Sequence, residues 1–473
     1  IEFGEKLGPL PLFNYPVWVI GLFYGALGII AGIMGAKYTY CIVVATHQVM
    51  GLKYSKIYEI ILTGIAVSAL GVGILTSLKV VPYVDAYYFM PGAGWYTLLG
   101  SFIFGFGIML GNGCMFGMLW KSGAGYVVNW FEIIGMIIGT IIFAFPIFNG
   151  LSLNKWWHTN GFFSIANGNP INFIPKDLGS FSGFALLIGL VFAIGIILPA
   201  LWMRKNRKEF ETGKGKLYES PYFLGTIFGL IMLASFVFAA GHFFNYLGVT
   251  TPVGLFASYL LNPFGINLGS KSDPNWFTTV PVISAYTFFI LMVILGAFIY
   301  SAASGNFEVK LPSRTTNRVA EIIIALIGGI ILAIGARMAQ GCSVGGFWSG
   351  LTGLSIFGLI FTVGFIPGTI AGYYAYVNLS SWASSIKKNN NIVNNKTIQQ
   401  HNKNHLYALI FGLIFGLLLI GISLELPGLN ATSATSIKPA LLVQYQNVLF
   451  GWGIFSIIMS FLIVFVRGYV VRR

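Results

Sequence analysis

The sequence predicts an all-α polytopic membrane protein, and three observations lead to that fold class. Of the 473 residues, 56% are hydrophobic and only 8% are charged, whereas about 25% of the residues of a soluble domain carry a charge. Apolar stretches of about 20 residues, the length that crosses a bilayer as a helix, recur along the whole chain. These stretches lack the alternation of a membrane β-barrel, so helices are expected to satisfy the backbone within the lipid.

Hydropathy and helix-breaking residues divide the chain into about eleven membrane spans. In chain order the spans are expected near residues 15–35, 57–77, 96–112, 131–150, 181–203, 221–240, 281–301, 318–338, 355–378, 405–426 and 441–466. The segments after the third and the eighth span are too short and too rich in glycine to cross the membrane. We therefore expect half-helices or re-entrant turns there, enclosed by protein or by a water-lined cavity.

Basic residues between the spans predict how the chain is oriented. The loop 204–216 contains six Lys or Arg residues, and loops rich in Lys and Arg face the cytoplasm. Alternating spans then put this loop, 387–404 and 468–473 in the cytoplasm and 151–180 outside. The N-terminus is expected outside the plasma membrane and the C-terminus in the cytoplasm. Because the net charge of +14 belongs to short loops, no nucleic-acid partner is expected.

Two stretches with a glycine before a cysteine indicate an internal repeat. "GIMLGNGCMFGMLWKSGAG" at 107–125 and "GARMAQGCSVGGFWSGLTG" at 335–353 share a frame of glycines, a tryptophan and a rare cysteine. The charge bias orients the spans before the two motifs in opposite directions, so the repeats are expected to be inverted. Inverted repeats with broken helices are typical of transporters, which bind their ligand near the membrane midplane.

This organisation predicts five regions along the chain. They are a first inverted repeat at 1–203, a basic cytoplasmic loop at 204–220, a second inverted repeat at 221–378, a polar linker at 379–404 and an accessory two-helix segment at 405–473. The linker is rich in Asn and Lys, a composition typical of disorder.

The chain has three cysteines, an odd number that does not indicate a disulfide framework. A single membrane cysteine is usually a small apolar filler, but Cys114 and Cys342 occupy equivalent breaks, which favours a role in a pathway. Cys41 lies in the first hairpin. A thiol is a weak donor and a soft acceptor, so it would suit a sulfur-bearing anion. We expect Cys114 and Cys342 on either side of the pseudo-axis and Cys41 towards one mouth.

Residues beside the cysteines also predict an anion path. Gly113 and Gly341 would let backbone N–H groups approach a ligand at the start of a half-helix. The side chains of Asn112 and Gln340, one residue earlier, would add amide donors, with hydrogen bonding between helices as the alternative.

Three basic residues lie within seven positions of a cysteine, namely Lys37, Lys121 and Arg337. Charges at membrane depth usually mark an ion or substrate path. Snorkelling to an interface is the alternative for Lys37 and Lys121. Arg337 fits that alternative less well, because it ends an apolar span directly before the second motif.

The pair of Gly-Cys-x-x-Gly motifs, with "GAR" at 335–337 and a cysteine in the first hairpin, resembles the YeeE/YedE family of sulfur transporters across residues 15–378. The resemblance implies import of thiosulfate along a path lined by Cys41, Cys114 and Cys342. A cytoplasmic sulfur-carrier protein is an expected partner, although no such domain is fused to the chain. The family's glycine before Gly-Cys is Asn112 in one motif and Gln340 in the other, which leaves the choice of sulfur anion open.

Signals for an enzyme are weak, and no catalytic residue, metal or other cofactor is expected. The five histidines show no metal-ligand spacing. Glu59, Glu132 and Glu321 each begin a span and are most simply interfacial, with proton coupling as the alternative. A membrane thiol oxidoreductase would need cysteines that pair, whereas these lie in separate breaks. An accessory subunit of a larger sulfur-metabolising membrane complex is the other alternative.

Overall fold

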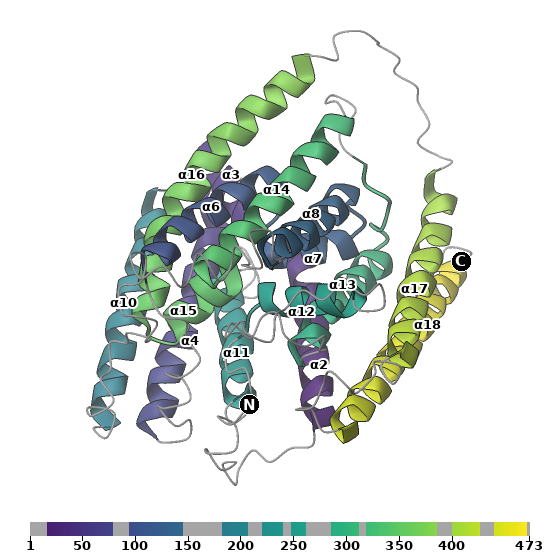
Figure 1. Cartoon of the computed structure of the whole chain (residues 1–473), viewed down its shortest axis with the longest axis horizontal. Helices are drawn as coiled ribbons and strands as arrows, with labels where there is room; N and C mark the ends of the chain where they lie inside the picture. The colour runs from purple at the N-terminus through teal and green to yellow at the C-terminus, as the bar shows by residue number, and fades with distance from the viewer. Residues whose placement is uncertain are drawn as a thin grey trace, which may run out of the picture.

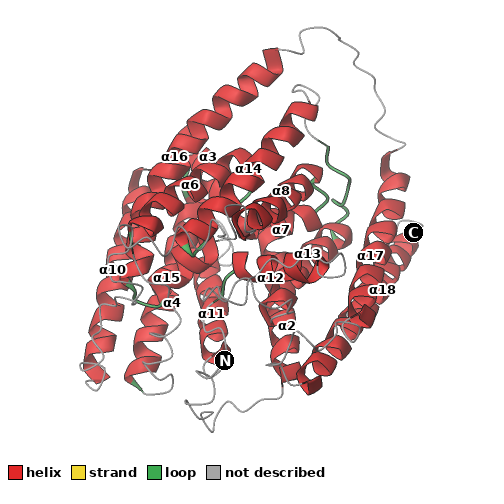
Figure 2. Cartoon of the chain, in the orientation of Figure 1, coloured by secondary structure: helices red, strands yellow, loops and turns green. Residues whose placement is uncertain are grey.

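The computed structural model describes residues 17–78, 94–144, 182–206, 220–239, 247–261, 285–311, 318–385, 400–425 and 439–470. Within these ranges the regular structure is helical (Figure 2), apart from an isolated bridge between Tyr126 and Lys310. The all-α fold class is therefore confirmed.

The N-terminal half carries the first hairpin and the first cysteine motif. Its helices are α2 (Val17–Tyr38), α3 (Ile42–His47), η1 (Gln48–Leu52), α4 (Lys56–Ser77), α6 (Trp95–Gly111), α7 (Met115–Gly123), α8 (Val127–Ala144) and α10 (Ser182–Asn206). The helix after the first motif, α7, has only nine residues. It is roughly 14 Å long, about half the thickness of a bilayer core.

The C-terminal half carries the second motif and ends in two long helices. Its helices are α11 (Pro221–Ala239), α12 (Thr250–Leu261), α13 (Ala285–Ala303), α14 (Arg318–Ala339), η6 (Ser343–Trp348), α15 (Ser349–Thr352), α16 (Ile356–Ser385), α17 (Gln400–Glu425) and α18 (Pro439–Val470). After the second motif the chain forms a π-helical turn, η6, and then one turn of α-helix. Short helices thus follow both cysteine motifs, as predicted.

Eight of the described helical segments are long and apolar enough to cross a membrane, by length and composition. Three shorter apolar helices, at Val127–Phe143, Pro221–Val237 and Asn447–Ile463, lie where the fourth, sixth and last spans were predicted. The described residues therefore contain a helix at every predicted span, and a multi-pass membrane protein is confirmed. The number of crossings and their directions stay predictions.

The helices of the two sequence repeats pack in a reciprocal order. α2 packs against α13 and α11 against α4, while α6 packs against α16 and α8 against α14. The helices that precede the two cysteine motifs, α6 and α14, pack directly against each other. A two-fold relation between the repeats predicts this exchange of partners; their inverted orientation stays a prediction.

Glycines bring the backbones of α6 and α14 into contact. Gly107 of α6 lies against the backbone of Leu332, and Gly335 of α14 lies against the backbone of Phe104. A side chain at either glycine would collide with the facing helix. Small residues at helix contacts are typical of membrane bundles, because burial from water does not drive helices together within lipid.

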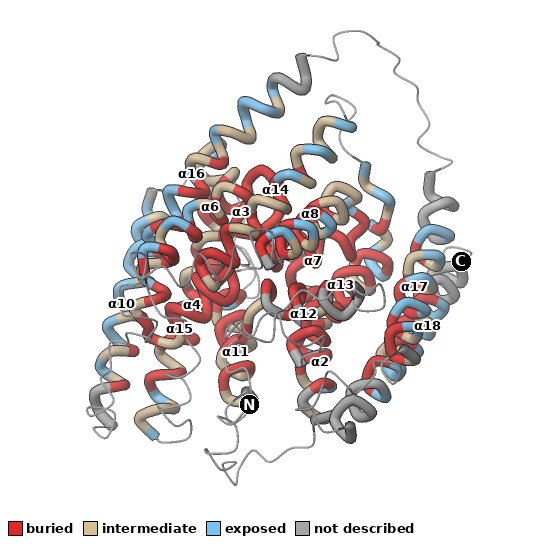
Figure 3. The backbone as a smooth tube through the Cα atoms, in the orientation of Figure 1, coloured by how far each residue is buried: buried red, intermediate tan, exposed pale blue. Residues whose placement is uncertain are grey.

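Apolar helices form the two outer edges of the bundle. α10 lies at one edge and packs against α4, and α17 and α18 lie at the other edge against α2 and α13 (Figure 1). α10 leaves a row of apolar side chains exposed (Figure 3), among them Leu187, Val191, Ile194, Leu198 and Trp202. An exposed row of this kind is expected where a helix faces lipid.

The polar linker predicted at 379–404 is shorter in the structure, because helices continue into both of its ends. α16 ends at Ser385 and α17 begins at Gln400. Neither 379–385 nor 400–404 contains Gly or Pro, so no helix-breaking residue stops a helix there. Residues 386–399, the loop 151–180 and most of 204–216 lie outside the described residues.

Candidate functional site

The first cysteine motif is a break between two helices. α6 ends at Gly111, and the next residue, Asn112, caps it with a left-handed backbone conformation and φ of 64°; Asn tolerates this conformation better than most residues. Cys114 is the N-cap of α7, and its Sγ accepts a hydrogen bond from the N–H of Gly117 at 3.2 Å. An amide of the first turn of α7 therefore points at the thiol sulfur.

The second motif repeats this geometry. Gln340 is left-handed with φ of 57°, and Cys342 is the N-cap of η6, with its Sγ accepting from the N–H of Gly345 at 3.3 Å. The N–H of Gly341 donates to the carbonyl of Ala336 at 3.0 Å, so this amide closes the end of α14 rather than facing a ligand. Asn112 and Gln340 thus terminate their helices through the backbone, a role that the sequence interpretation did not assign to them.

Cys41 lies beside Cys114. It is the N-cap residue of α3, and its Sγ donates to the Sγ of Cys114 at 3.6 Å. Both thiols are free and buried. Gly117 leaves the space for them, since a Cβ there would collide with Cys41 Sγ. The two cysteines lie in separate breaks of the chain, as predicted, but the expectation that they do not pair is wrong, because the turn after α2 folds onto the start of α7.

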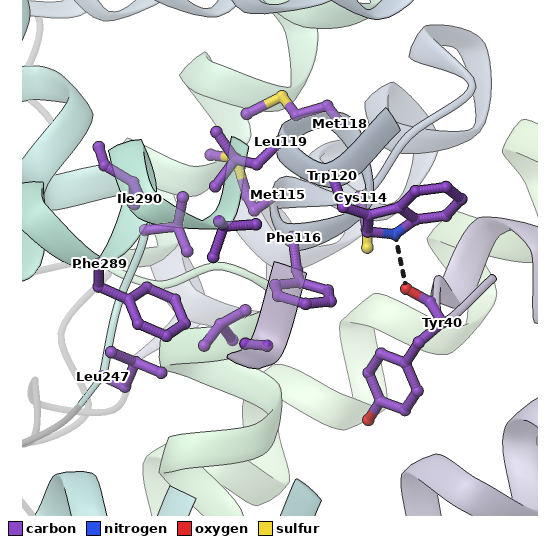
Figure 4. Close-up of a cluster of buried hydrophobic side chains, with 14 of the residues drawn as sticks. Tyr40, Cys114, Met115, Phe116, Met118, Leu119, Trp120, Leu247, Phe289 and Ile290 are labelled. Carbon is purple, nitrogen blue, oxygen red and sulfur yellow. Dashed lines mark hydrogen bonds between the residues drawn. The ribbon is translucent and has the colours of Figure 1, made fainter. Parts of the chain in front are cut away.

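An aromatic cluster adjoins the thiol pair and reaches the second motif. Tyr40 stacks on Phe228 of α11 with 4.0 Å between ring centroids, and its ring lies 5.8 Å from that of Trp348 and 5.9 Å from that of Phe116. The indole N–H of Trp120 donates to the backbone carbonyl of Tyr40 at 2.9 Å (Figure 4). The cluster thus joins the residue before Cys41 to both short cysteine-bearing helices.

The three basic residues differ in their placement. Lys121 is only 6% exposed, and its Nζ donates to the carbonyl of Asn112, so its charge lies at the first break. Arg337 is buried and donates to the carbonyl of Thr250 at the start of α12. Lys37 is exposed at the end of α2, and the snorkelling alternative stays open for it.

Two of the carboxylates assigned to the interface are fully buried. Glu59 and Glu132 are both 0% exposed. The Oγ of Ser55 donates to Glu59 Oε1 at 2.8 Å, and the Nδ2 of Asn129 donates to Glu132 Oε2 at 2.7 Å. The interfacial interpretation is therefore wrong for both. In the sequence, a glutamate at the start of an apolar span resembles an interfacial residue. The sign that each would be buried was a residue three or four positions earlier whose amide or hydroxyl group can donate to the carboxylate.

Two buried hydroxyl groups next to the cysteines were not singled out from the sequence. The Oη of Tyr40 and the Oγ of Ser343 have no hydrogen-bond partner within the part of the chain that the structure describes. A buried hydroxyl without a partner costs free energy. Both groups are therefore suited to donate to a ligand that reaches Cys41 or Cys342.

Among the described residues, no group of three or more His, Cys, Asp or Glu side chains could hold a metal ion. His47 instead lies edge-on to the rings of Tyr373 and Tyr376, 5.1 Å and 5.4 Å away.

Comparison with known proteins gives one family and several relatives. Residues 39–371 match the family described as Sulphur transport. The chain is 25% identical over 335 residues to "Thiosulfate transporter TsuA" of Escherichia coli, covering 69% of this chain and 85% of the relative. It is 25% identical over 281 residues to "Thiosulfate transporter TsuA" of Spirochaeta thermophila, covering 58% and 74%. "Probable transporter YedE" of Escherichia coli is 28% identical over 156 residues, covering 33% and 34%.

Proposed function

Because this chain belongs to the Sulphur transport family, we propose that it imports a sulfur-containing anion, and that the anion is thiosulfate. Two relatives that align with more than half of the chain carry the name thiosulfate transporter. The proposed path runs past Cys41, Cys114 and Cys342, inside a bundle whose outer helices face lipid.

The contact between the thiols of Cys41 and Cys114 carries this proposal. Their sulfur atoms lie 3.6 Å apart in the buried core. An anion that enters the core must shed water, and other donors must replace the lost hydration. Each thiol offers an S–H donor to a soft terminal sulfur, and the N–H of Gly117 already points at Cys114. The anion would insert between the two thiols. The contact between their sulfur atoms would then be replaced by contacts of the thiols with the sulfur of the anion.

Cys342 supplies a second position with the same chemistry. The N–H of Gly345 points at its sulfur, and the unpartnered hydroxyl of Ser343 adjoins it in the chain. Lys121 adds a positive charge at the first break. Several weak sites in succession let an ion enter without being trapped.

Uptake into proteoliposomes tests the proposal. The purified full chain should accumulate labelled thiosulfate, and excess unlabelled thiosulfate should compete better than sulfite or sulfate. Cys114→Ala should abolish uptake. Ser122→Ala on α7 is the control, because it also removes one heteroatom from a buried side chain but leaves the thiols in place. No thiosulfate uptake by the unmodified protein would contradict the proposal.

A membrane thiol oxidoreductase is the second candidate, and the same 3.6 Å contact favours it. Two thiols this close need only a small movement to form a disulfide. Mass shifts after alkylation under oxidising and reducing conditions separate the candidates. A transporter keeps three alkylatable thiols in both conditions, whereas an oxidoreductase loses two on oxidation.

The proposed cytoplasmic partner is a sulfur-carrier protein that accepts the imported sulfur. Its docking side follows from the predicted orientation, with 204–216 in the cytoplasm. Stimulation of uptake by a carrier protein enclosed in the vesicles would test this step separately.

A further inference from the structure

We propose that Glu132 binds a proton when the anion occupies the site at Cys114, so that transport is coupled to protonation of this carboxyl. The inference rests on the proposed function and extends it, because it names the ion that moves with the anion. Glu132 has no part in the thiol path described above, and neither the family nor the relatives' names assign it a role.

The carboxyl of Glu132 lies directly behind the first break. It is 0% exposed and faces the backbone of Gly111 and Gly113, where an added Cβ would collide with its oxygens. Gly113 immediately precedes Cys114. A change of charge on Glu132 therefore acts on the backbone that holds the thiol.

The two oxygens of this carboxyl have different surroundings. Oε2 accepts a hydrogen bond from the Nδ2 of Asn129 at 2.7 Å. Oε1 is buried and has no hydrogen-bond partner among the described residues. An ionised carboxylate that is buried with half of its acceptor capacity empty is costly, whereas a protonated one needs fewer donors and can donate through Oε1. Oε1 of Glu132 can therefore carry one proton.

The surrounding charges are few. Among the described residues, the titratable side chains of Lys121 on α7 and of Cys41 lie close enough to influence Glu132. α14 presents Gly329 to the backbone of Glu132, and α6 ends here at Gly111. The Nζ of Lys121 donates to the carbonyl of Asn112, and no ion pair between Lys121 and Glu132 forms in the described part of the chain.

The coupling follows from charge balance at the break. With Glu132 ionised, its negative charge offsets that of Lys121 and repels an anion that approaches Cys114. When Glu132 takes up a proton, the carboxylate becomes a neutral carboxylic acid and the charge of Lys121 is left to attract the anion. Anion and proton therefore favour each other's binding, and this coupling is reciprocal.

Calorimetry on the full chain in detergent tests the inference with thiosulfate as the ligand. Titrations at several pH values, each in buffers of different ionisation enthalpy, report protons taken up with the anion. We expect uptake of a proton with binding at the pH values where Glu132 is ionised in the free protein, and tighter binding at lower pH. Binding with no proton uptake at any pH would overturn this inference alone. Absence of thiosulfate binding would overturn both it and the proposed function.

The variant Glu132→Gln tests whether the coupled proton binds to this residue. The variant keeps the shape and stays neutral, so it should bind thiosulfate with a pH-independent affinity and without proton uptake. Glu59→Gln is the matched control, because Glu59 is equally buried but pairs with Ser55 of its own helix cap; it should retain the proton uptake of the unmodified protein. Should Glu132→Gln take up as many protons as the unmodified protein, Glu132 is not the proton site. If that variant fails to fold, the buffer series on the unmodified protein still decides whether a proton is coupled.

Discussion

The sulfur atoms of Cys41 and Cys114 lie 3.6 Å apart although 73 positions separate the two residues in the chain. The contact joins the turn after α2 to the start of α7. One thiol donates and the other accepts, and the proposed anion path runs past this pair. The third sulfur, that of Cys342, has the same N-cap geometry as that of Cys114 but lies in the C-terminal half of the chain.

Serine substitutions test whether sulfur itself is needed. Cys114→Ser and Cys342→Ser preserve shape and hydrogen bonding, but a hydroxyl is a harder donor than a thiol. We expect each to leave the thermal midpoint almost unchanged and to lower thiosulfate uptake at least tenfold, which corresponds to about 1.4 kcal/mol. Uptake at the parent rate would mean that any small polar group is sufficient.

Space between the thiols is tested at Gly117. A Cβ at this position would collide with Cys41 Sγ and lie 3.2 Å from Cys114 Sγ, so Gly117→Ala should separate the pair. Overpacking of this kind costs about 1–3 kcal/mol. We expect lost uptake together with a lower thermal midpoint.

Gly195→Ala on α10 is the control for Gly117→Ala, because nothing lies within 4 Å of a Cβ there. It should behave like the parent in both assays. Parent-like uptake by Gly117→Ala would contradict the importance of the close thiol contact.

The unpartnered hydroxyl of Tyr40 gives opposite expectations for stability and transport. Tyr40→Phe removes a buried group without a partner, so the folded state should be stabilised by about 1 kcal/mol. If the hydroxyl donates to the passing anion, uptake should fall at the same time. Tyr58→Phe is the control, because the Tyr58 hydroxyl already has a partner, the hydroxyl of Thr46 at 2.8 Å. A variant that is both more stable and fully active would assign Tyr40 to packing alone.

Removal of the last two helices tests the predicted domain boundary. Phe411 of α17 lies 5.0 Å from Phe298 of α13 between ring centroids, and Trp452 of α18 covers Gly25 of α2. We therefore expect a chain that ends at residue 385 to fold with a lower thermal midpoint and to bind thiosulfate. Aggregation of this shortened chain in detergent would show that α17 and α18 complete the bundle.

The predicted orientation is tested with single reporter cysteines in a cysteine-free variant. Reporters in 204–216 should react with a membrane-impermeant reagent only after the cells are opened. Reporters in 151–180 should react in intact cells. Labelling of 204–216 from outside would contradict the inverted orientation of the repeats.

Much of the fold could be predicted because hydropathy is a local property. Each predicted span contains a helix, and both Gly-Cys motifs begin short helices. The contact of Cys41 with Cys114 could not be predicted, since it depends on how two distant turns pack. Lys37 and Lys121 show the same limit. Both lie near a cysteine in the sequence, but Lys37 is exposed and Lys121 is buried. The difference depends on which face of each helix packs against the rest of the protein.

The left-handed residues Asn112 and Gln340 were interpreted by their side chains, whereas their backbones terminate the helices. A helix-ending Asn before Gly is a recognisable signal of that role. Glu132 was harder to identify, because its burial comes from the glycines of α6 and α14 that face it. Gly111 of α6 lies 21 positions before Glu132, and Gly329 of α14 lies 197 positions after it. No local sequence pattern shows that these residues come together.

Gly107 and Gly335 put the backbones of α6 and α14 in direct contact, so we expect this contact to resist rocking of one half against the other. We expect side chains to open and close the proposed path instead, and the stacked rings of Tyr40 and Phe228 are the candidates for this movement. Ring reorientation is generally faster than the microsecond-to-millisecond motion of whole domains. We therefore expect uptake to depend only weakly on bilayer stiffness, because no large movement of one half against the other is needed.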